Sequence, residues 1–212
     1  MVKELDQQTQ QKILSAARTV IIRHGKSGAR MQDIADEAGV NKALLHYYFR
    51  SKDKIYRAVL DEVVQDLFST LLESIDLEDP FERMLKNFIR EHIGAIQKHQ
   101  ALFQFFFAEV WTNKEELVPL IREMMQTNRG LIPELFFARI NKAVYQKEIR
   151  AVDPFHFLMN LLSLDIFFFI FSPMFFDLVQ MPEEQQQKVT DERAGQVFDF
   201  IWNSIRPEEA PQ

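Results

Sequence analysis

The 212-residue chain contains no cysteine, and it has only six glycines and eight prolines. The absence of cysteine excludes disulfide bonds and thiolate metal sites, and it suits a reducing compartment. The first residues, MVKELDQQTQQK, have no apolar stretch like that of a secretory signal peptide. We therefore expect a cytoplasmic protein, and the 47% of hydrophobic residues is enough for a substantial core.

Charge is unevenly divided along the chain. The net charge of −6 argues against a protein that binds nucleic acid over its whole surface. Residues 1–52, however, carry nine Lys or Arg against five Asp or Glu, whereas the remainder carries sixteen against twenty-six. This asymmetry predicts a basic head on an acidic body.

Helical spacing of apolar residues recurs along almost the whole chain, and no alternating strand pattern is convincing. We expect an all-α fold of about nine helices. They are a first helix that ends at Gly25, two short ones at 31–39 and 41–48, two that begin at Ser51 and at Asp79-Pro80, and others over 101–112, 117–147, 154–176 and 189–205. Gly130 and Pro133 should bend or break the long helix, and QMPEEQQQK (180–188) should be a polar loop.

The segment NKALLHYYFRSK (41–52) places four rings among cationic side chains. It follows a short helix and a corner at Gly39, which is the arrangement of a helix-turn-helix. The second helix of that motif enters the major groove of DNA, and Asn41 can cap its first turn. Its outer face would consist of Lys42, Ala43, His46 and Tyr47, while Leu45 and Phe49 would point into the core.

These side chains suit contact with DNA. Lys42 and His46 would face the groove, Ala43 would allow close approach, and Tyr47 and Tyr48 would meet phosphate and sugar at the flanks. Lys52 lies in the first turn of the following helix, where its charge opposes the helix dipole unless a phosphate is also bound there.

The stretch MQDIADEAGVNKALLHYYFRSKDKIYRAVL resembles the DNA-binding domain of the tetracycline-repressor family of bacterial transcriptional regulators. The matching residues are Asp33, Ile34, Ala35, Ala38, Gly39, Val40, Lys42, Leu45, Tyr47, Phe49, Ser51 and Lys52. The match covers about residues 10–60, and the rest agrees in length, helix count and all-α character. The resemblance implies a helix-turn-helix DNA-binding domain over 1–54 and a helical effector-binding and dimerisation domain over 55–212.

The chain departs from the family pattern at three positions. Ala29 and Leu44 stand where threonine is common, and His46 replaces a frequent tyrosine. Family members often touch DNA at the positions of Arg30 and Gln32. The expected DNA-binding residues are Arg30, Gln32, Asn41, Lys42, Ala43, Leu44, His46, Tyr47, Tyr48 and Lys52.

Phenylalanine is unusually frequent, with twenty residues, of which nineteen lie beyond residue 50. Such clusters form either ordinary core or the wall of an apolar cavity. Because the resemblance implies a small-molecule effector, the excess suggests a hydrophobic or aromatic one. The candidate ligand-binding residues are His92, Phe103, Phe106, Phe107, Trp111, Met125, Asn128 and Phe136.

The stretch FLMNLLSLDIFFFIFSPMFF (157–176) has a single charge and is long enough to span a bilayer. Polar residues and Pro173 interrupt it, and no basic flank orients it, so a core helix contacted on all sides explains it as well. The resemblance implies that it pairs with the last helix across a homodimer interface, for which the candidates are Leu161, Phe168, Phe198, Ile201, Trp202 and Ile205. Asp165 should find a partner or lie at an interface edge, because burying an unpaired carboxylate is costly.

The remaining sequence motifs give little evidence for a function. GKS (25–27) lacks the earlier glycine of a phosphate-binding loop, since position 20 is valine. His92 and His99 share a helical face but lack further ligands for a metal site. No set of nucleophile, base and orienting group is present, so we expect neither an enzyme nor a cofactor.

The function expected from the sequence is a ligand-responsive regulator, most simply a repressor. It would bind a palindromic double-stranded DNA operator as a homodimer and leave it when a small molecule binds. One alternative is a small-molecule binding protein whose DNA-binding head is degenerate. Another is a membrane-anchored regulator that uses residues 157–176.

Overall fold

The protein is described by a computed structural model that covers residues 2–73, 75–127 and 132–207, without the side chains of residues 2–5, 67–73, 124–127 and 132–133. These residues form ten α-helices and no strand, which confirms the all-α prediction. The chain divides into two compact units, described separately below. The first unit comprises Met1–Asp66 and Ala101–Ile121, and the second comprises Leu67–Gln100 and Arg122–Gln212.

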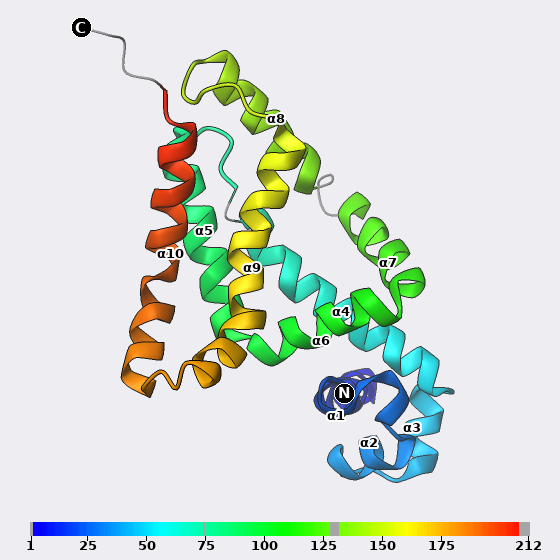
Figure 1. Cartoon of the computed structure of the whole chain (residues 1–212). Helices are drawn as coiled ribbons and strands as arrows, with labels where there is room; N and C mark the ends of the chain where they lie inside the picture. Colours follow the sequence, from blue (N-terminus) through cyan, green and yellow to red (C-terminus); the bar gives the residue numbers. More distant parts are fainter. Residues whose placement is uncertain (1, 74, 128–131, 208–212) are drawn as a thin grey trace, which may run out of the picture. The chain divides into compact units, whose positions relative to one another are not determined.

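The first unit contains α1 (Val2–Gly28), α2 (Met31–Glu37), α3 (Lys42–Tyr48), most of α4 (Lys52–Glu73) and α6 (Gln100–Thr112), and the start of α7 (Lys114–Thr127) (Figure 1). Its apolar core is formed by side chains at helical spacing that are fully buried. They include Ile13, Ala17, Ile21, Ile34, Leu45, Ile55 and Val59. Helices α1 and α4 therefore each bury one apolar stripe in this core.

Gly25 interrupts α1 at the position where the sequence predicts its end. Its backbone has φ 67° and ψ 175°, a conformation that L-residues with a side chain rarely adopt. One further turn follows, and the amide of Ala29 then donates to the carbonyl of Gly25 at 3.2 Å. The glycine therefore lets the chain change direction ahead of α2.

The second unit contains α5 (Phe81–Lys98), α8 (Ile132–Tyr145), α9 (Pro154–Leu178) and α10 (Glu183–Ile205), and α5 packs against the other three. The inner face of α5 consists of Phe81, Leu85, Phe88, His92 and Ile96, which recur at helical spacing and are all buried. Rings fill the space between the helices, with Phe88 and Phe136 at 5.2 Å and Phe136 and Phe157 at 6.2 Å between centroids. Most of the aromatic excess around Phe136 is therefore packed core.

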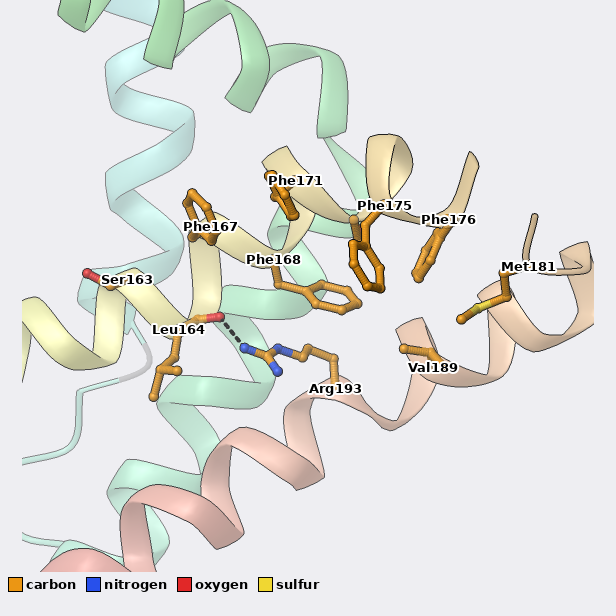
Figure 2. Close-up of a pocket in the computed structure, with 11 residues that line it drawn as sticks. Ser163, Leu164, Phe167, Phe168, Phe171, Phe175, Phe176, Met181, Val189 and Arg193 are labelled. Carbon is orange, nitrogen blue, oxygen red and sulfur yellow. Dashed lines mark hydrogen bonds between the residues drawn. The ribbon is translucent and has the colours of Figure 1, made fainter. Parts of the chain in front are cut away.

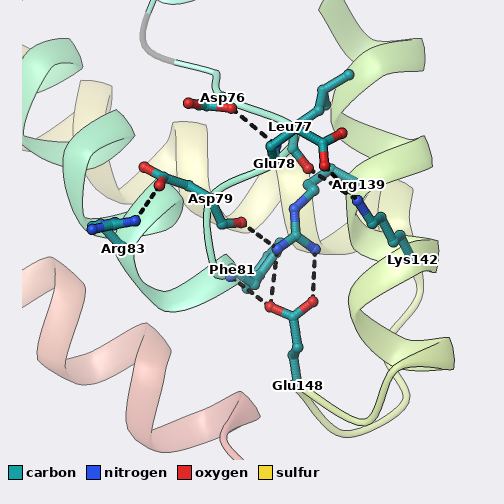
Figure 3. Close-up of polar contacts among 9 residues, drawn as sticks. All are labelled: Asp76, Leu77, Glu78, Asp79, Phe81, Arg83, Arg139, Lys142 and Glu148. Carbon is teal, nitrogen blue, oxygen red and sulfur yellow. Dashed lines mark hydrogen bonds and ion pairs between the residues drawn. The ribbon is translucent and has the colours of Figure 1, made fainter.

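Arg139, which is buried in α8, pairs with the partly exposed Glu148 that follows this helix, and both contact the start of α5 (Figure 3). Arg139 is 2% exposed, and its Nη1 and Nη2 donate to the two carboxylate oxygens of Glu148 at 3.2 and 2.9 Å. Nη2 also donates to the backbone carbonyl of Asp79 at 2.7 Å, and the amide of Phe81 donates to Glu148 at 2.6 Å. Glu148 thus satisfies a free amide in the first turn of α5 from a distant part of the chain.

Two expected boundaries differ from the structure. The expected helix over 117–147 is divided into α7, which begins at Lys114, and α8, which has Pro133 in its first turn, while Gly130 lies outside the described residues. The polar loop expected over 180–188 is wrong, because α10 begins at Glu183 directly after Pro182. Glutamate and glutamine are good helix formers, and two glutamates in the first turn favour the helix dipole.

Helix α9 is apolar around its whole circumference, but it is not enclosed on all sides. Its inner face, which includes Leu161 and Phe169, is buried against the second unit. The outer stripe of α9 is exposed and consists of Phe167, Ile170, Phe171, Met174 and Leu178. Among the described helices, α9 has the length and hydropathy of a membrane span, and 28% of its most apolar window is buried. Periodicity could not identify the exposed side, because hydrophobic residues occupy both.

Candidate nucleic-acid interface

The turn between α2 and α3 is built as the sequence predicts. Gly39 adopts φ 60°, and the amides of Gly39 and Val40 donate to the carbonyls of Asp36 and Ala35, both at 3.0 Å. This pattern closes the end of α2 with a left-handed glycine. Asn41 then caps α3, since its side-chain oxygen accepts the amide of Leu44 at 2.8 Å. The capping prediction is confirmed.

Helix α3 separates its side chains into two faces. Leu45 is fully buried and Phe49 is 6% exposed, so both belong to the core of the first unit. Lys42, Ala43, Leu44, His46 and Tyr47 are exposed on the other side, and Tyr47 is 73% exposed. The predicted division of rings and charges along this helix is confirmed. The exposed face offers one full cation, an imidazole and a phenol within two helical turns.

Tyr48 has a partner that the sequence did not indicate. Its hydroxyl donates to the carboxylate of Asp6, in the first part of α1, at 2.6 Å. This hydrogen bond raises the pKa of the Tyr48 phenol, and burial contributes less. The rings of Tyr47 and Tyr48 meet edge to face at 5.2 Å. Tyr48 therefore holds the start of α1 beside α3, while the hydroxyl of Tyr47 lies on the exposed face.

Two predicted DNA-binding residues, Arg30 and Gln32, lie at the start of α2. Arg30 occupies the N-cap position and makes no side-chain cap, and Ala29 before it is 1% exposed. Gln32 donates from Nε2 to the carboxylate of Asp36 at 2.8 Å. Arg30 is exposed, and it stays a predicted DNA-binding residue.

Lys52 begins α4 and is half-buried. Its ammonium donates to the backbone carbonyl of Ser27 at 3.2 Å, near the end of α1, where a positive charge is favourable. Ser51 caps α4, because its hydroxyl accepts the amide of Lys54 at 3.3 Å. The unfavourable interaction of the Lys52 charge with the start of α4 is therefore offset in part by its favourable interaction with the end of α1.

The first unit also contains a polar cluster that sequence reasoning missed. Lys26 lies 4.6 Å above the ring of Tyr56 and forms ion pairs with Glu116 at 2.6 Å and Asp53 at 3.4 Å. The hydroxyl of the fully buried Tyr56 donates to the carboxylate of Glu109. Burial is the first cause that raises the pKa of Tyr56, followed by this hydrogen bond. Residues of α6 and α7 are thereby fixed to α1 and α4 within the first unit.

The predicted effector residues are divided between the two units. Phe103, Phe106, Phe107 and Trp111 belong to the first, where Trp111 is 85% exposed. His92 and Phe136 belong to the second, where both are buried. Asn128 lies outside the described residues, as does the side chain of Met125. Phe136 packs between other rings, and the predicted set stays a prediction.

The predicted dimer residues lie mainly on the inner faces of α9 and α10. Leu161, Phe198, Ile201 and Ile205 are buried within the chain, and Phe168 and Trp202 are half-buried. The Phe198 and Trp202 rings stack at 6.2 Å. These side chains pack within the second unit, and their part in a dimer stays a prediction. Hydrophobic spacing alone gave no means of telling the two faces apart.

The comparisons with known proteins agree with this geometry. Residues 13–59 match the family model described as "Bacterial regulatory proteins, tetR family". The chain is 27% identical over 139 residues to the "Probable acrEF/envCD operon repressor" of Escherichia coli K12, which covers 61% of each chain. It is also 27% identical over 144 residues to the transcriptional regulator RutR of the same strain, covering 68% of this chain and 66% of RutR. The chain thus spans about three fifths of the first of these relatives.

Solved structures share the fold along almost the whole length. A TetR-family transcription regulator from Marinobacter aquaeolei VT8 superposes with a TM-score of 0.65 at 18% identity, covering 97% of this chain and all of the other. The TetR-family regulator PfmR from Thermus thermophilus gives 0.60 at 19% identity, covering 86% and 96%. The capped helix-turn-helix lies within the matched residues, so these findings identify residues 13–59 as a DNA-binding domain of the tetR type.

Proposed function

We propose that the protein is a transcriptional regulator, acting as a repressor, that binds a palindromic operator through α3. The observation that carries this proposal is the exposed face of α3, with Lys42 and His46 on a helix anchored from behind by Leu45 and Phe49. A capped, rigidly packed helix with small Ala43 at its start suits entry into the major groove.

The proposed operator is read by two copies. A twofold dimer places two recognition helices roughly 34–36 Å apart, one turn of DNA. The outer stripe of α9 supports a homodimer, because monomeric proteins rarely expose an apolar surface of this extent. Pairing of two copies through α9 and α10 would bury this apolar surface. No membrane would then be needed to cover it, as expected for a cytoplasmic protein.

Release by a small molecule completes the proposal. A ligand that prefers the conformer with low operator affinity shifts the dimer towards that conformer. The ratio of the ligand's affinities for the two conformers sets how far operator affinity can fall. The polar cluster around Lys26 and Tyr56 supports such coupling, since it ties α6 and α7 to the helices that flank α3.

The test is selection of bound sequences from random DNA, followed by gel shift with the DNA upstream of the protein's own gene. We expect a palindrome whose half-sites are about one turn apart. Lys42→Ala should lose this preference, whereas Lys98→Ala, in the second unit, should keep it. Recovery of no preferred sequence by a folded wild-type dimer would contradict the proposal and favour the alternative of a small-molecule binding protein with a degenerate head.

A further inference from the structure

A polar cleft of about 620 Å³ lies between α1, α4 and α6 in the first unit. Its walls come from the end of α1, the first turn of α4, and the last turns of α6 with the residue that follows them. The principal lining residues are Gly25, Lys26, Lys52, Asp53, Glu109 and Asn113. The volume lies within the range of small-molecule sites, and charged and amide side chains in the walls suit a polar occupant.

Glu109 is a buried carboxylate in the wall of this cleft, and its residue is 3% exposed. Two donors meet on one of its oxygens, because Oε2 accepts the hydroxyl of Tyr56 and, at 2.5 Å, Nδ2 of Asn113. The other oxygen, Oε1, accepts no hydrogen bond from the residues that the structure describes. A buried carboxylate oxygen without a donor costs free energy, so this position favours a ligand that brings a charged N–H group.

Two lysines line the cleft, and they differ in how their charges are balanced. Lys26 forms ion pairs with Glu116 at 2.6 Å and Asp53 at 3.4 Å. Lys52 is half-buried and donates to the backbone carbonyl of Ser27 at 3.2 Å, and it forms no ion pair within the described part of the chain. Because an ammonium group has three N–H donors, Lys52 has two left for an anion.

We propose that this cleft binds a small zwitterion of the amino-acid class, with its ammonium group on Oε1 of Glu109 and its carboxylate on Lys52. A purely cationic ligand would meet the charge of Lys52 without an anion to offset it. A purely anionic ligand would meet the carboxylates of Asp53 and Glu109. A zwitterion matches both unbalanced charges, and charge-assisted hydrogen bonds are strong where water is partly excluded.

Binding in this cleft would reach the operator through Lys52. The same ammonium group is the predicted phosphate contact, so a ligand carboxylate bound to it would take the place of a DNA phosphate. Release of DNA by the zwitterion rests on the proposed function. The binding itself does not, because every contact invoked lies within the first unit. Zwitterion binding without an operator contradicts the proposed function alone, and an operator without zwitterion binding contradicts this inference alone.

The apolar groove between α9 and α10 in the second unit is a less suitable ligand site (Figure 2). Phe167 and Phe171 line it, and both belong to the outer stripe of α9 that the proposed homodimer covers. A ligand in that groove would therefore compete with the second copy. The cleft of the first unit is formed by α1, α4 and α6, none of which takes part in the proposed pairing through α9 and α10.

The test is isothermal titration calorimetry on the full chain without DNA, using glycine, γ-aminobutyrate and ε-aminocaproate, whose charged groups lie at increasing separations. The matched controls for the best of them are the acid of the same length without the ammonium group and the amide without the carboxylate. We expect saturable binding of at least one zwitterion, and binding of each control weaker by about tenfold or more. No saturable binding of any zwitterion, or equal affinity for either control, would overturn the inference.

Four variants locate the site. Glu109→Gln and Lys52→Gln should each weaken the best zwitterion by about tenfold or more, and Lys52→Gln should leave its amide within about twofold of wild type. Lys54→Gln removes an exposed cation from the same turn of α4 outside the cleft, and should leave the zwitterion within about twofold. Ala108→Phe should weaken all ligands by filling the cleft. Thermal unfolding establishes that each variant is folded, and Lys52→Gln with Ala108→Phe decides the matter if Glu109→Gln is not.

Lys52 itself is the competing partner of Glu109. If its side chain turned from Ser27 to Oε1 of Glu109, the cleft would hold an internal ion pair and would bind no zwitterion. This alternative predicts that Lys52→Gln and Glu109→Gln lose less stability together than the sum of their separate losses. A double-mutant cycle in urea without ligand measures this difference. Non-additive losses together with no saturable binding would overturn the inference and assign the free oxygen of Glu109 to Lys52.

Discussion

Nδ1 of His92 lies 2.8 Å from Oδ2 of Asp165, and the two side chains, on α5 and α9, are almost completely buried. The expectation that Asp165 needs a partner is confirmed by this contact. Burial raises the pKa of Asp165, and the hydrogen bond with His92 opposes the rise. The pair therefore compensates a charge at the centre of an otherwise apolar helix contact.

Loss of His92 should destabilise the fold in a pH-dependent manner. His92→Leu leaves Asp165 buried without this partner, and breaking such a pair costs about 3–5 kcal/mol. Because the folded-state pKa of the carboxyl lies above its unfolded value, the folded state binds the proton more tightly, so stability falls as pH rises from the unfolded to the folded pKa. Urea unfolding should show His92→Leu more destabilised at pH 8 than at pH 5.

The double variant His92→Leu with Asp165→Leu is the control for this prediction. Replacing both partners by apolar groups should restore much of the lost stability and abolish the pH dependence. An equal loss at both pH values would mean that the effect of His92 is packing alone.

The ion pair of Arg139 and Glu148 makes the opposite prediction for acid. The hydrogen bond from Arg139 lowers the pKa of Glu148, while burial opposes the change. Stability from this pair is therefore present above the unfolded pKa of about 4.3 and is lost as pH falls through the lower folded pKa. Glu148→Gln should cost about 1–3 kcal/mol at neutral pH and reduce the acid dependence of unfolding.

Glu78→Gln is the matched control, because Glu78 is 88% exposed and lies 3.7 Å from Lys142. Surface pairs of this kind contribute about 0–1 kcal/mol. Chemical denaturation of the two variants between pH 3 and 7 compares them directly. Similar losses of stability in the two variants would show that the burial of Arg139 does not strengthen its ion pair with Glu148.

The DNA-binding lysines should separate into two classes. Lys42→Ala should cost roughly 1–3 kcal/mol at one base position if it grips guanine. Lys52→Ala should weaken all sequences alike and lower the slope of log affinity against log salt by about one per subunit. Fluorescence anisotropy on a set of single-base operator variants at several salt concentrations measures both. A changed base preference in Lys52→Ala, with an unchanged slope, would place Lys52 on a base edge.

The contact of Tyr48 with Asp6 predicts that these two residues act as one unit. If the Tyr48 hydroxyl positions the start of α1, Tyr48→Phe and Asp6→Asn should reduce operator affinity by similar factors, and the double variant should be no worse than either. If Tyr48 binds phosphate instead, Tyr48→Phe should weaken DNA binding while Asp6→Asn, which removes a carboxylate, strengthens it. A gel-shift titration of the three variants distinguishes these outcomes.

Local rules explain what the sequence could predict. The Asn41 cap, the Gly39 corner and the inward Leu45 follow from spacing within one or two turns, so they were accessible without the fold. The contact between Lys26 and Glu116 joins residues 90 positions apart and leaves no local pattern. The same holds for the attachment of α6 to the first unit and for Tyr48 with Asp6.

The uniform hydrophobicity of α9 gave no indication of which side of the helix is buried. Its mean composition predicted a buried helix, but only packing decides which side meets α5 and α10. Four of the six predicted dimer residues, Leu161, Phe198, Ile201 and Ile205, are buried within the chain, and their part in a dimer stays a prediction.

The outer stripe of α9 should control the oligomeric state. Phe167→Asp and Met174→Asp place charges on exposed positions and should leave the melting temperature of the monomer almost unchanged. Each should weaken the dimer, since a charge at the centre of an apolar interface costs several kcal/mol and a truncated central aromatic often costs about 2 kcal/mol or more. Operator affinity should fall with dimer stability, because one subunit grips only half of a palindrome.

Phe198→Asp and Trp202→Ala act differently: Phe198 is 7% exposed and stacks on Trp202, so both variants should lower monomer stability as well. Sedimentation over a dilution series, with thermal unfolding alongside, separates the two classes. A Phe167→Asp protein that sediments as a dimer at the same concentrations as wild type would rule out the outer stripe as the interface.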